Sequence, residues 1–181
     1  MFKKVLNTFG KNHFLRSGKT LPHDEIIDYG EQLAKSQRIL VLMPKDPEEF
    51  QSAIASYKAL RNSLSLAKFT LVVHELHAQQ LPAPLKINSI LITAKDITPL
   101  GLVHKNFFKH FMKAFDLVID MNFTFELCST FIASRSDAKV RICFCHPERE
   151  PFYNLQFSTQ EENTCEQRIA VMIKYITLLM K

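Results

Sequence analysis

The sequence predicts an α/β protein, a Rossmann-like domain of three layers with a mainly parallel sheet of about five strands and helices on both faces. Short continuous apolar runs, typical of parallel strands that are buried on both faces, recur along the chain. Segments with apolar residues at helical spacing separate these runs. The composition agrees, because 46% of the 181 residues are hydrophobic and only four are glycine, which excludes disordered and collagen-like chains.

The chain opens on a basic amphipathic segment, and we expect Gly10 to end its helix. The i, i+3, i+4, i+7 spacing of one helical face is met by four apolar residues: Phe2, Val5, Leu6 and Phe9. The net charge of +5 is accounted for by the five cations that precede the first acidic residue: Lys3, Lys4, Lys11, Arg16 and Lys19. Because charges balance in the remainder, the excess indicates a basic arm on a neutral body and no nucleic-acid partner.

Residues 1–36 are therefore expected to form a basic helical extension, with a second helix near 24–35, and residues 37–181 a single Rossmann-like domain. Within the domain we expect helices and strands to alternate. In chain order the expected elements are a strand at 38–43, a helix at 47–63, a strand at 69–73, a strand at 89–93, a helical region from 98, a strand at 115–120, a helix at 124–134, a strand at 139–145, an edge strand at 152–157 and a last helix. Ser158 and Glu161 are expected to form the capping box of that last helix.

Ligands of open parallel sheets bind beyond the carboxyl ends of the strands, here the loops 44–49, 121–125 and 145–150. None of these loops contains a glycine, whereas the phosphate cradles of dinucleotide- and ATP-binding proteins need glycines for close backbone approach. We therefore expect no cofactor. The polar side chains in two of these loops are candidate ligand-binding residues: Lys45, Glu48, Asn122 and Thr124.

Acidic residues open the helix after the first strand. Asp46 is expected to be its N-cap, with Pro47 in the first turn and Glu49 completing a capping box. The alternative for Glu49 is catalytic, because a carboxylate at this edge of the sheet can act as a general base.

Two groups of possible metal ligands are present, but neither supplies a full coordination set, so we expect no metal site. His74 and His77 lie three residues apart beyond a strand. Cys143 and Cys145 fall on one side of a strand next to His146, where a pair of buried thiols is the simpler interpretation.

The four cysteines lack the spacing of a disulfide framework, and lysines interrupt the apolar residues at the N-terminus, so we expect neither a secretory signal nor disulfides. No apolar stretch approaches the length of about 20 residues that a membrane-spanning helix needs. These features predict a cytoplasmic protein, with attachment to the inner face of the membrane through the basic arm as a further expectation.

The segment 115–144 reads FDLVIDMNFTFELCSTFIASRSDAKVRICF, a strand, a helix and a strand. Together with residues 38–61 it resembles the N-terminal, acceptor-side Rossmann half of the family 9 glycosyltransferases, the heptosyltransferases of lipopolysaccharide synthesis. The Gly-Asp pair of that family falls on Glu48 and Glu49 in an ungapped alignment, and the resemblance implies that Glu49 stands at the position of the family's catalytic base. That family binds its nucleotide-sugar donor in a second domain, which we expect to be absent from this chain.

Over nearly its whole length the chain also resembles a family of small uncharacterised bacterial proteins, through PKDPEEF, FDLVIDM, SDAKVRI and FYNLQF. The two resemblances imply a non-catalytic binding or interaction module related to a glycosyltransferase acceptor domain. The alternative is the acceptor half of a split glycosyltransferase whose donor-binding domain is another protein. The basic arm implies docking on an anionic membrane surface or an acidic protein partner, unless its apolar residues cover the sheet or a helix instead.

Overall fold

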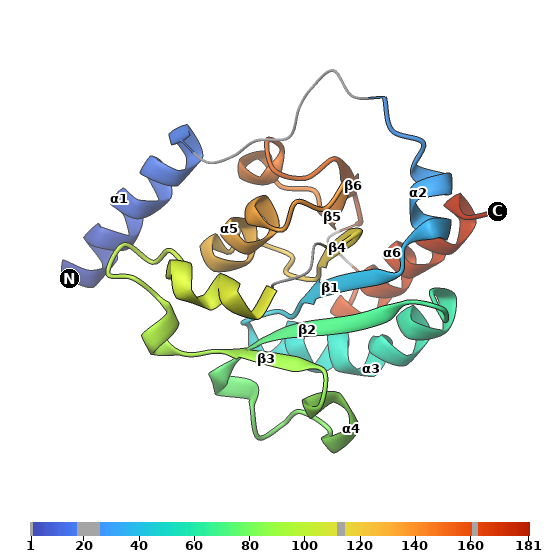
Figure 1. Cartoon of the computed structure of the whole chain (residues 1–181), viewed down its shortest axis with the longest axis horizontal. Coiled ribbons are helices and arrows are strands. Elements are labelled where there is room, and N and C mark those ends of the chain that lie inside the picture. The colour runs from blue at the N-terminus through green and yellow to red at the C-terminus, as the bar shows by residue number, and fades with distance from the viewer. Residues whose placement is uncertain (1, 18–25, 112–114, 161–162) are drawn as a thin grey trace.

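The computed structural model describes residues 2–17, 26–111, 115–160 and 163–181. Its sheet has six strands, all parallel, in the order β3-β2-β1-β4-β5-β6, which confirms the α/β class and its Rossmann-like arrangement (Figure 1). The strands are β1 (Arg38–Leu42), β2 (Lys68–His74), β3 (Ser89–Ile92), β4 (Leu117–Asp120), β5 (Val140–Phe144) and β6 (Leu155–Phe157). The edge strand expected at 152–157 is present as the shorter β6.

The described α-helices are α1 (Phe2–Ser17), α2 (Tyr29–Lys35), α3 (Pro47–Ser63), α4 (Ala83–Lys86), α5 (Leu127–Arg135) and α6 (Cys165–Leu179). Short 3-10 helices connect them: η1 (Glu75–His77), η2 (Ala94–Asp96), η3 (Lys105–Phe111) and η4 (Pro147–Arg149). No described helix has both the length and the apolar character needed to cross a membrane.

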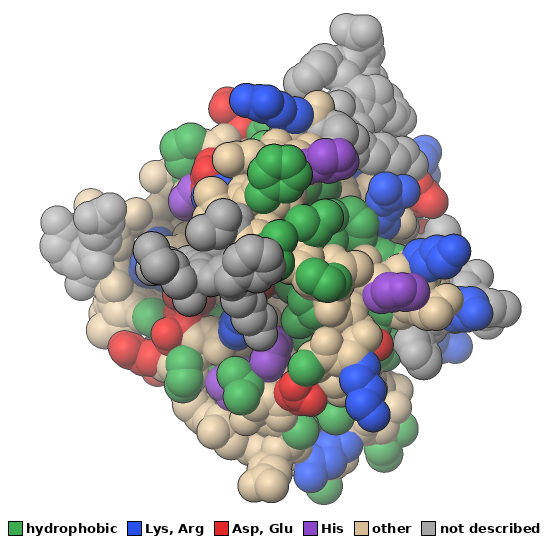
Figure 2. All heavy atoms as spheres, turned by 90° about the vertical axis from the view of Figure 1, so that its left-hand side faces the viewer, with side chains coloured by type: hydrophobic (Ala, Val, Ile, Leu, Met, Phe, Trp, Pro, Cys, Tyr) green, Lys and Arg blue, Asp and Glu red, His purple; other side chains and the backbone are tan. Residues whose placement is uncertain are grey.

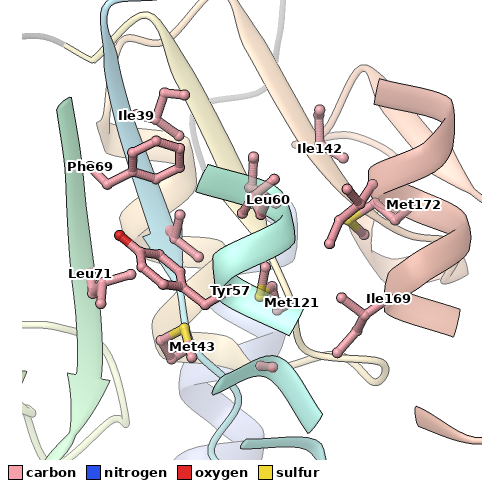
Figure 3. Close-up of a cluster of buried hydrophobic side chains, with 14 of the residues drawn as sticks. Ile39, Met43, Tyr57, Leu60, Phe69, Leu71, Met121, Ile142, Ile169 and Met172 are labelled. Atoms are coloured by element: carbon pink, nitrogen blue, oxygen red, sulfur yellow. The ribbon is translucent and has the colours of Figure 1, made fainter. Parts of the chain in front are cut away.

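One face of the sheet is covered by α2, α3 and α6 (Figure 1). Alternate residues of the central strands point into this layer, and seven of them are fully buried: Ile39, Val41, Leu71, Val73, Leu117, Ile119 and Ile142. Figure 3 shows how Leu60 of α3 and Ile169 and Met172 of α6 meet the strand side chains. This continuous apolar layer holds the sheet and fixes the start of α3 beside the end of β1.

The opposite face is covered by α5, η3 and α1, with Leu40 and Val118 among the strand residues that point toward them. Phe14 of α1 is only 3% exposed and stacks on Phe152, with ring centroids 4.6 Å apart. Because Leu33 of α2 is buried in the first layer, residues 1–36 supply side chains to both faces of the sheet.

Three local expectations are wrong. The helical region expected after residue 98 is a loop followed by the 3-10 helix η3, in which Phe107 is buried. The capping box of α6 is formed by Thr164 and Gln167, with the residue expected to complete it, Glu161, outside the described part of the chain. Cys145 lies beyond the end of β5 and is exposed, so it does not form a buried pair with Cys143.

Gly10 does not end the first helix, which continues to Ser17. Gly10 is buried against the loop that precedes η3, and a Cβ at this position would lie 1.9 Å from the carbonyl oxygen of Leu100. The absence of a side chain therefore lets α1 approach that loop, and this approach brings Phe14 onto the second layer. Phe9, on the predicted apolar face of the arm, stays 66% exposed, while Leu6 is half-buried.

Gly10→Ala tests this docking. In an isolated helix the substitution stabilises by about 1 kcal/mol, because alanine is the better helix former. Here we expect the opposite sign, a loss of about 1–3 kcal/mol from overpacking against Leu100, with faster amide hydrogen exchange in α1. Asn12→Ala, at an exposed position of the same helix, is the control and should leave exchange unchanged. Equal protection of α1 in the two variants would contradict the docking role of Gly10.

Candidate functional site

The strand order reverses between β1 and β4, so the chain leaves these neighbouring strands in opposite directions at their carboxyl ends. A crevice opens at such a point in parallel sheets. The carboxyl ends of the strands point toward α1, on the left in Figure 1. The loops that follow β1 to β4, together with α1, form this edge of the molecule.

A buried ion pair lies at the end of β4. Asp120 and Arg149 are both fully buried, and Arg149 Nη2 donates to Asp120 Oδ2 over 3.0 Å. The hydroxyl of Tyr153 donates to the same oxygen over 2.5 Å, while the backbone and side-chain amides of Asn122 donate to Asp120 Oδ1. Every carboxylate oxygen therefore has partners, as a charge removed from water requires.

The protonation states in this cluster follow from burial and from Asp120. Burial by itself lowers the pKa of Arg149, but Asp120, Tyr153 and Cys143 raise it above its usual range. The pKa of Tyr153 is raised, first by burial and then by Asp120. The cluster thus holds a cation, an anion and a neutral phenol at neutral pH.

Asn122 connects this cluster to the loop after β1. Its Oδ1 accepts from the backbone N–H of Lys45 over 3.2 Å, and its Nδ2 donates to Ser129 at the start of α5. The carbonyl of Lys45 is in turn 2.9 Å from Nε2 of His77, whose ring is buried and stacks on Phe50. The backbone of Lys45 is therefore held from both sides.

A groove of about 730 Å³ lies at this edge. Its walls come from α1 and from the segments that follow β1, β2, β3 and β4, and a much smaller cavity beneath it shares Lys45, His74, Glu126 and Cys128. Figure 2 looks onto this side of the molecule, where apolar side chains gather at the centre and charged and histidine side chains surround them. The groove is therefore amphipathic.

Most charged groups in the groove already have partners. Lys11 forms a 2.7 Å ion pair with Glu148 and lies 4.9 Å from the ring centroid of Phe125. Glu75 accepts from the backbone N–H of Ala94, and Glu126 accepts from that of Ser129 as the N-cap of α5. Among the described residues, no side-chain partner engages the ammonium group of Lys45, which is exposed.

His74 is half-buried at the end of β2, and its Nδ1 accepts from the backbone N–H of Leu76 over 3.3 Å. Burial is the main cause that lowers its pKa, and the charge of Lys45 adds to the effect. The ring is therefore neutral at pH 7 and carries its proton on Nε2. His74 can donate a hydrogen bond to a ligand but has no free nitrogen to accept a proton.

Glu49 lies on the other side of the crevice and does not line the groove. Its Oε2 accepts from the backbone N–H of Phe123, so it does not complete the expected capping box; Asp46 alone caps α3, through the amides of Glu48 and Glu49. Burial is the largest cause that raises the pKa of Glu49, and Asp46 adds to it. Arg168 lies near, 4.1 Å above the ring of Phe123.

The candidate residues from the sequence therefore fall in different surroundings. Lys45 lines the groove, Glu48 and Thr124 are exposed outside its lining, and Asn122 is buried within the polar cluster. Of the basic arm, Lys11 lines the groove and Arg16 is exposed. Lys19 and the side chains of Lys3 and Lys4 lie outside the described residues.

Asp120 and Arg149 were not among the candidate residues that the sequence indicated. The sequence does single out Asp120, because it is a charged residue at the end of an otherwise apolar predicted strand. Nothing in the sequence indicates the role of Arg149, because its partner Asp120 is 29 residues away along the chain. In the described part of the chain, His74 and His77 belong to no cluster of three or more His, Cys, Asp or Glu residues that could hold an ion.

The comparisons with known proteins give one match. The family model of DUF6913, a family of unknown function, matches residues 15–179. No curated protein and no solved structure matches the chain. The matched segment includes Lys45, His74 and the Asp120 cluster, whereas the residues of α1 that line the groove, Thr8 and Lys11, precede it.

Asp120→Asn tests the buried cluster. The variant keeps the shape of the side chain but leaves the guanidinium of Arg149 buried without a counter-charge, so we expect a loss of about 3–5 kcal/mol in the free energy of unfolding. Tyr153→Phe removes one hydrogen bond from the same oxygen and should cost about 1–2 kcal/mol. Urea denaturation measures both values. A loss for Asp120→Asn no larger than that for Tyr153→Phe would contradict the dependence of this edge on the ion pair.

Glu49→Gln tests the electrostatics at the start of α3. Because the folded protein raises the pKa of Glu49, the ionised carboxylate destabilises the fold, and stability falls as the pH rises through this pKa. We expect the variant to be more stable than the wild type at pH 7 by a few tenths of a kcal/mol after solvent screening, and this gain to vanish near pH 3, where both states are protonated.

Glu48→Gln removes the adjacent, exposed charge from the same first turn and is the matched control, so at pH 7 Glu49→Gln should be the more stable of the two variants. Asp46→Ala, which removes the N-cap, should cost about 1 kcal/mol. A loss of stability for Glu49→Gln at pH 7 comparable to that for Asp46→Ala would mean that Glu49 is a structural cap after all.

Proposed function

We propose that this chain, which belongs to the DUF6913 family of unknown function, is a non-catalytic binding module that holds a small molecule in the groove at the carboxyl edge of its sheet. The groove itself carries this proposal. Its volume of about 730 Å³ lies within the range of ligand sites, and it occupies the edge at which parallel sheets bind their ligands. The resemblance to the acceptor-side domain of family 9 glycosyltransferases agrees with binding at this edge.

The chemistry of the groove supports binding over catalysis. Cys128 lines it, but burial and Glu126 raise the pKa of the thiol, which keeps it protonated and a poor nucleophile. His74 has its acceptor nitrogen occupied by Leu76, and Glu126 holds the first turn of α5. Cys128, His74 and Glu126 are thus each neutral or engaged by the backbone.

The second candidate function is the acceptor half of a split glycosyltransferase that needs a separate donor-binding protein. Glu49 favours it, because a carboxylate with a raised pKa is suited to proton transfer and stands at the position of that family's catalytic base. Its hydrogen bond to Phe123 and its place outside the groove lining favour the binding module instead.

The basic arm carries a proposal of its own, attachment of a cytoplasmic protein to an anionic membrane surface or to an acidic protein. The exposed ring of Phe9 supports it, since an apolar side chain beside cations suits an anionic lipid surface. Lys11 supports it less, because its charge is already paired with Glu148. Gly10 and Phe14 face the body, so the arm would dock through the outer side of α1.

The proposed function predicts binding without turnover. Metabolite mixtures added to the purified chain should shift the amide NMR signals of groove residues such as Lys45, His74 and Leu127, and nucleotide sugars should give no transfer product. Leu76→Trp narrows the groove from an exposed position and should abolish the shifts, whereas Leu66→Trp, at an exposed leucine before β2, should preserve them. Sugar transfer that appears when a donor-binding protein is added, and that is lost in Glu49→Gln, would establish the split glycosyltransferase instead.

A further inference from the structure

We propose that the ligand of the groove is a singly charged oxyanion on an apolar body, with its anionic group at Lys45 and His74 and its body along the wall of Leu76 and Leu127. This inference rests on the proposed function and adds the chemical class of the ligand. The shared chemistry is one negative charge on oxygen, as in a carboxylate or a phosphodiester.

Lys45 is the group of the described groove lining best placed to bind an anion. The other ammonium group of the lining, that of Lys11, has its counter-charge in Glu148 at 2.7 Å. Lys45 has no such partner among the residues that the structure describes, although it lines both the groove and the small cavity beneath it. An incoming anion can therefore form a charge-assisted hydrogen bond with Lys45 without breaking an existing ion pair.

The position of Lys45 is also prepared for binding. Asn122 accepts from its backbone N–H and His77 contacts its carbonyl, so both peptide groups beside its side chain are held by buried residues. His74 next to it is neutral and carries a proton on Nε2, which adds a second donor. Fixed donors reduce the ordering cost of binding.

Two carboxylates limit the ligand to one charge. Glu75 and Glu126 line the groove, and each accepts a hydrogen bond from a backbone amide. A dianion such as sulfate would be repelled by both carboxylates while gaining only Lys45, the cation of the described lining that has no side-chain partner. A monoanion matches Lys45 and meets less repulsion.

The apolar side chains of the groove lining would contact the uncharged part of the ligand. Leu76 is 66% exposed although it lines the groove, and Ile97, Pro99 and Leu127 continue the apolar wall. An apolar body laid along this wall would remove its surface from water, which is favourable in proportion to the area covered. Charge at one end and apolar surface along the wall together define an amphiphile.

The experiment uses anilinonaphthalene sulfonate, a fluorescent monoanion with an aromatic body, and the folded full chain. We expect the wild type to bind the dye and decanoate to displace it, whereas decanol should compete at least about tenfold more weakly, the value of one hydrogen bond to a charged group. Lys45→Gln should weaken binding of dye and decanoate by about the same factor. Lys45→Arg should restore it, and Lys58→Gln, which removes an exposed charge on α3, should leave it unchanged.

Thermal melting first shows that each variant is folded. Equal affinities for decanoate and decanol, or equal effects of Lys45→Gln and Lys58→Gln, would overturn the anion assignment while leaving the groove a binding site. If neither the dye nor decanoate binds the wild type, and Leu76→Trp does not alter the metabolite-induced shifts of the amide NMR signals, the proposed function fails as well.

Two further measurements identify the source of the oxyanion. Binding to phosphatidylglycerol vesicles but not to phosphatidylcholine vesicles, lost in Lys45→Gln, would support the inference with a lipid phosphodiester as the anion. Displacement of the dye by decanoate without vesicle binding would support it with a soluble carboxylate. Displacement by sulfate at the concentration effective for decanoate would overturn the requirement for an apolar body and a single charge.

Discussion

The ion pair between Asp120 and Arg149 is the interaction on which the carboxyl edge of the sheet depends. Both groups are fully buried, and burial of a charge is costly unless the charge is paired and hydrogen-bonded. Tyr153 and Asn122 donate hydrogen bonds to Asp120, and the carbonyl of Asn122 accepts from Arg149 over 2.7 Å. The loops after β4 and β5 must therefore lie together. Asn122 connects them to the loop after β1, because its side chain accepts a hydrogen bond from the backbone N–H of Lys45.

The elements predicted from the sequence are those that local patterns determine. β1 and β2 are apolar runs, and α3 has Asp46 as cap and Pro47 in its first turn, so their bounds differ little from the expected ones. Long-range contacts decide the exceptions. Gly10 is a poor helix former by propensity, yet α1 continues through it to Ser17. A glycine is present at this position because a larger residue would not fit against Leu100. Local propensity carries no information about that neighbour.

The candidate site was predictable in place but not in composition. The carboxyl edge follows from the parallel sheet, and Lys45 was identified from its loop. Glu49 fits a capping box by spacing, yet its carboxylate bonds to Phe123, 74 residues away along the chain. Asn122, a candidate ligand-binding residue by its place in the sequence, is buried, and its side chain bonds to Asp120 and to the backbone of Lys45. Which polar side chain faces a ligand and which supports the backbone depends on contacts that only the folded chain creates.

Charge and shape in the groove come from different parts of the molecule. Its unpaired cation, Lys45, sits on a loop that the buried cluster holds, so the position of the charge is set by the core of the domain. The outer wall is α1, whose lysine in the lining, Lys11, is neutralised by Glu148. The helix therefore contributes mainly steric boundaries, held by the close contact at Gly10 and the stacking of Phe14. A change in the docking of α1 would alter the size of the ligand that fits, while the preference for an anion would stay with Lys45.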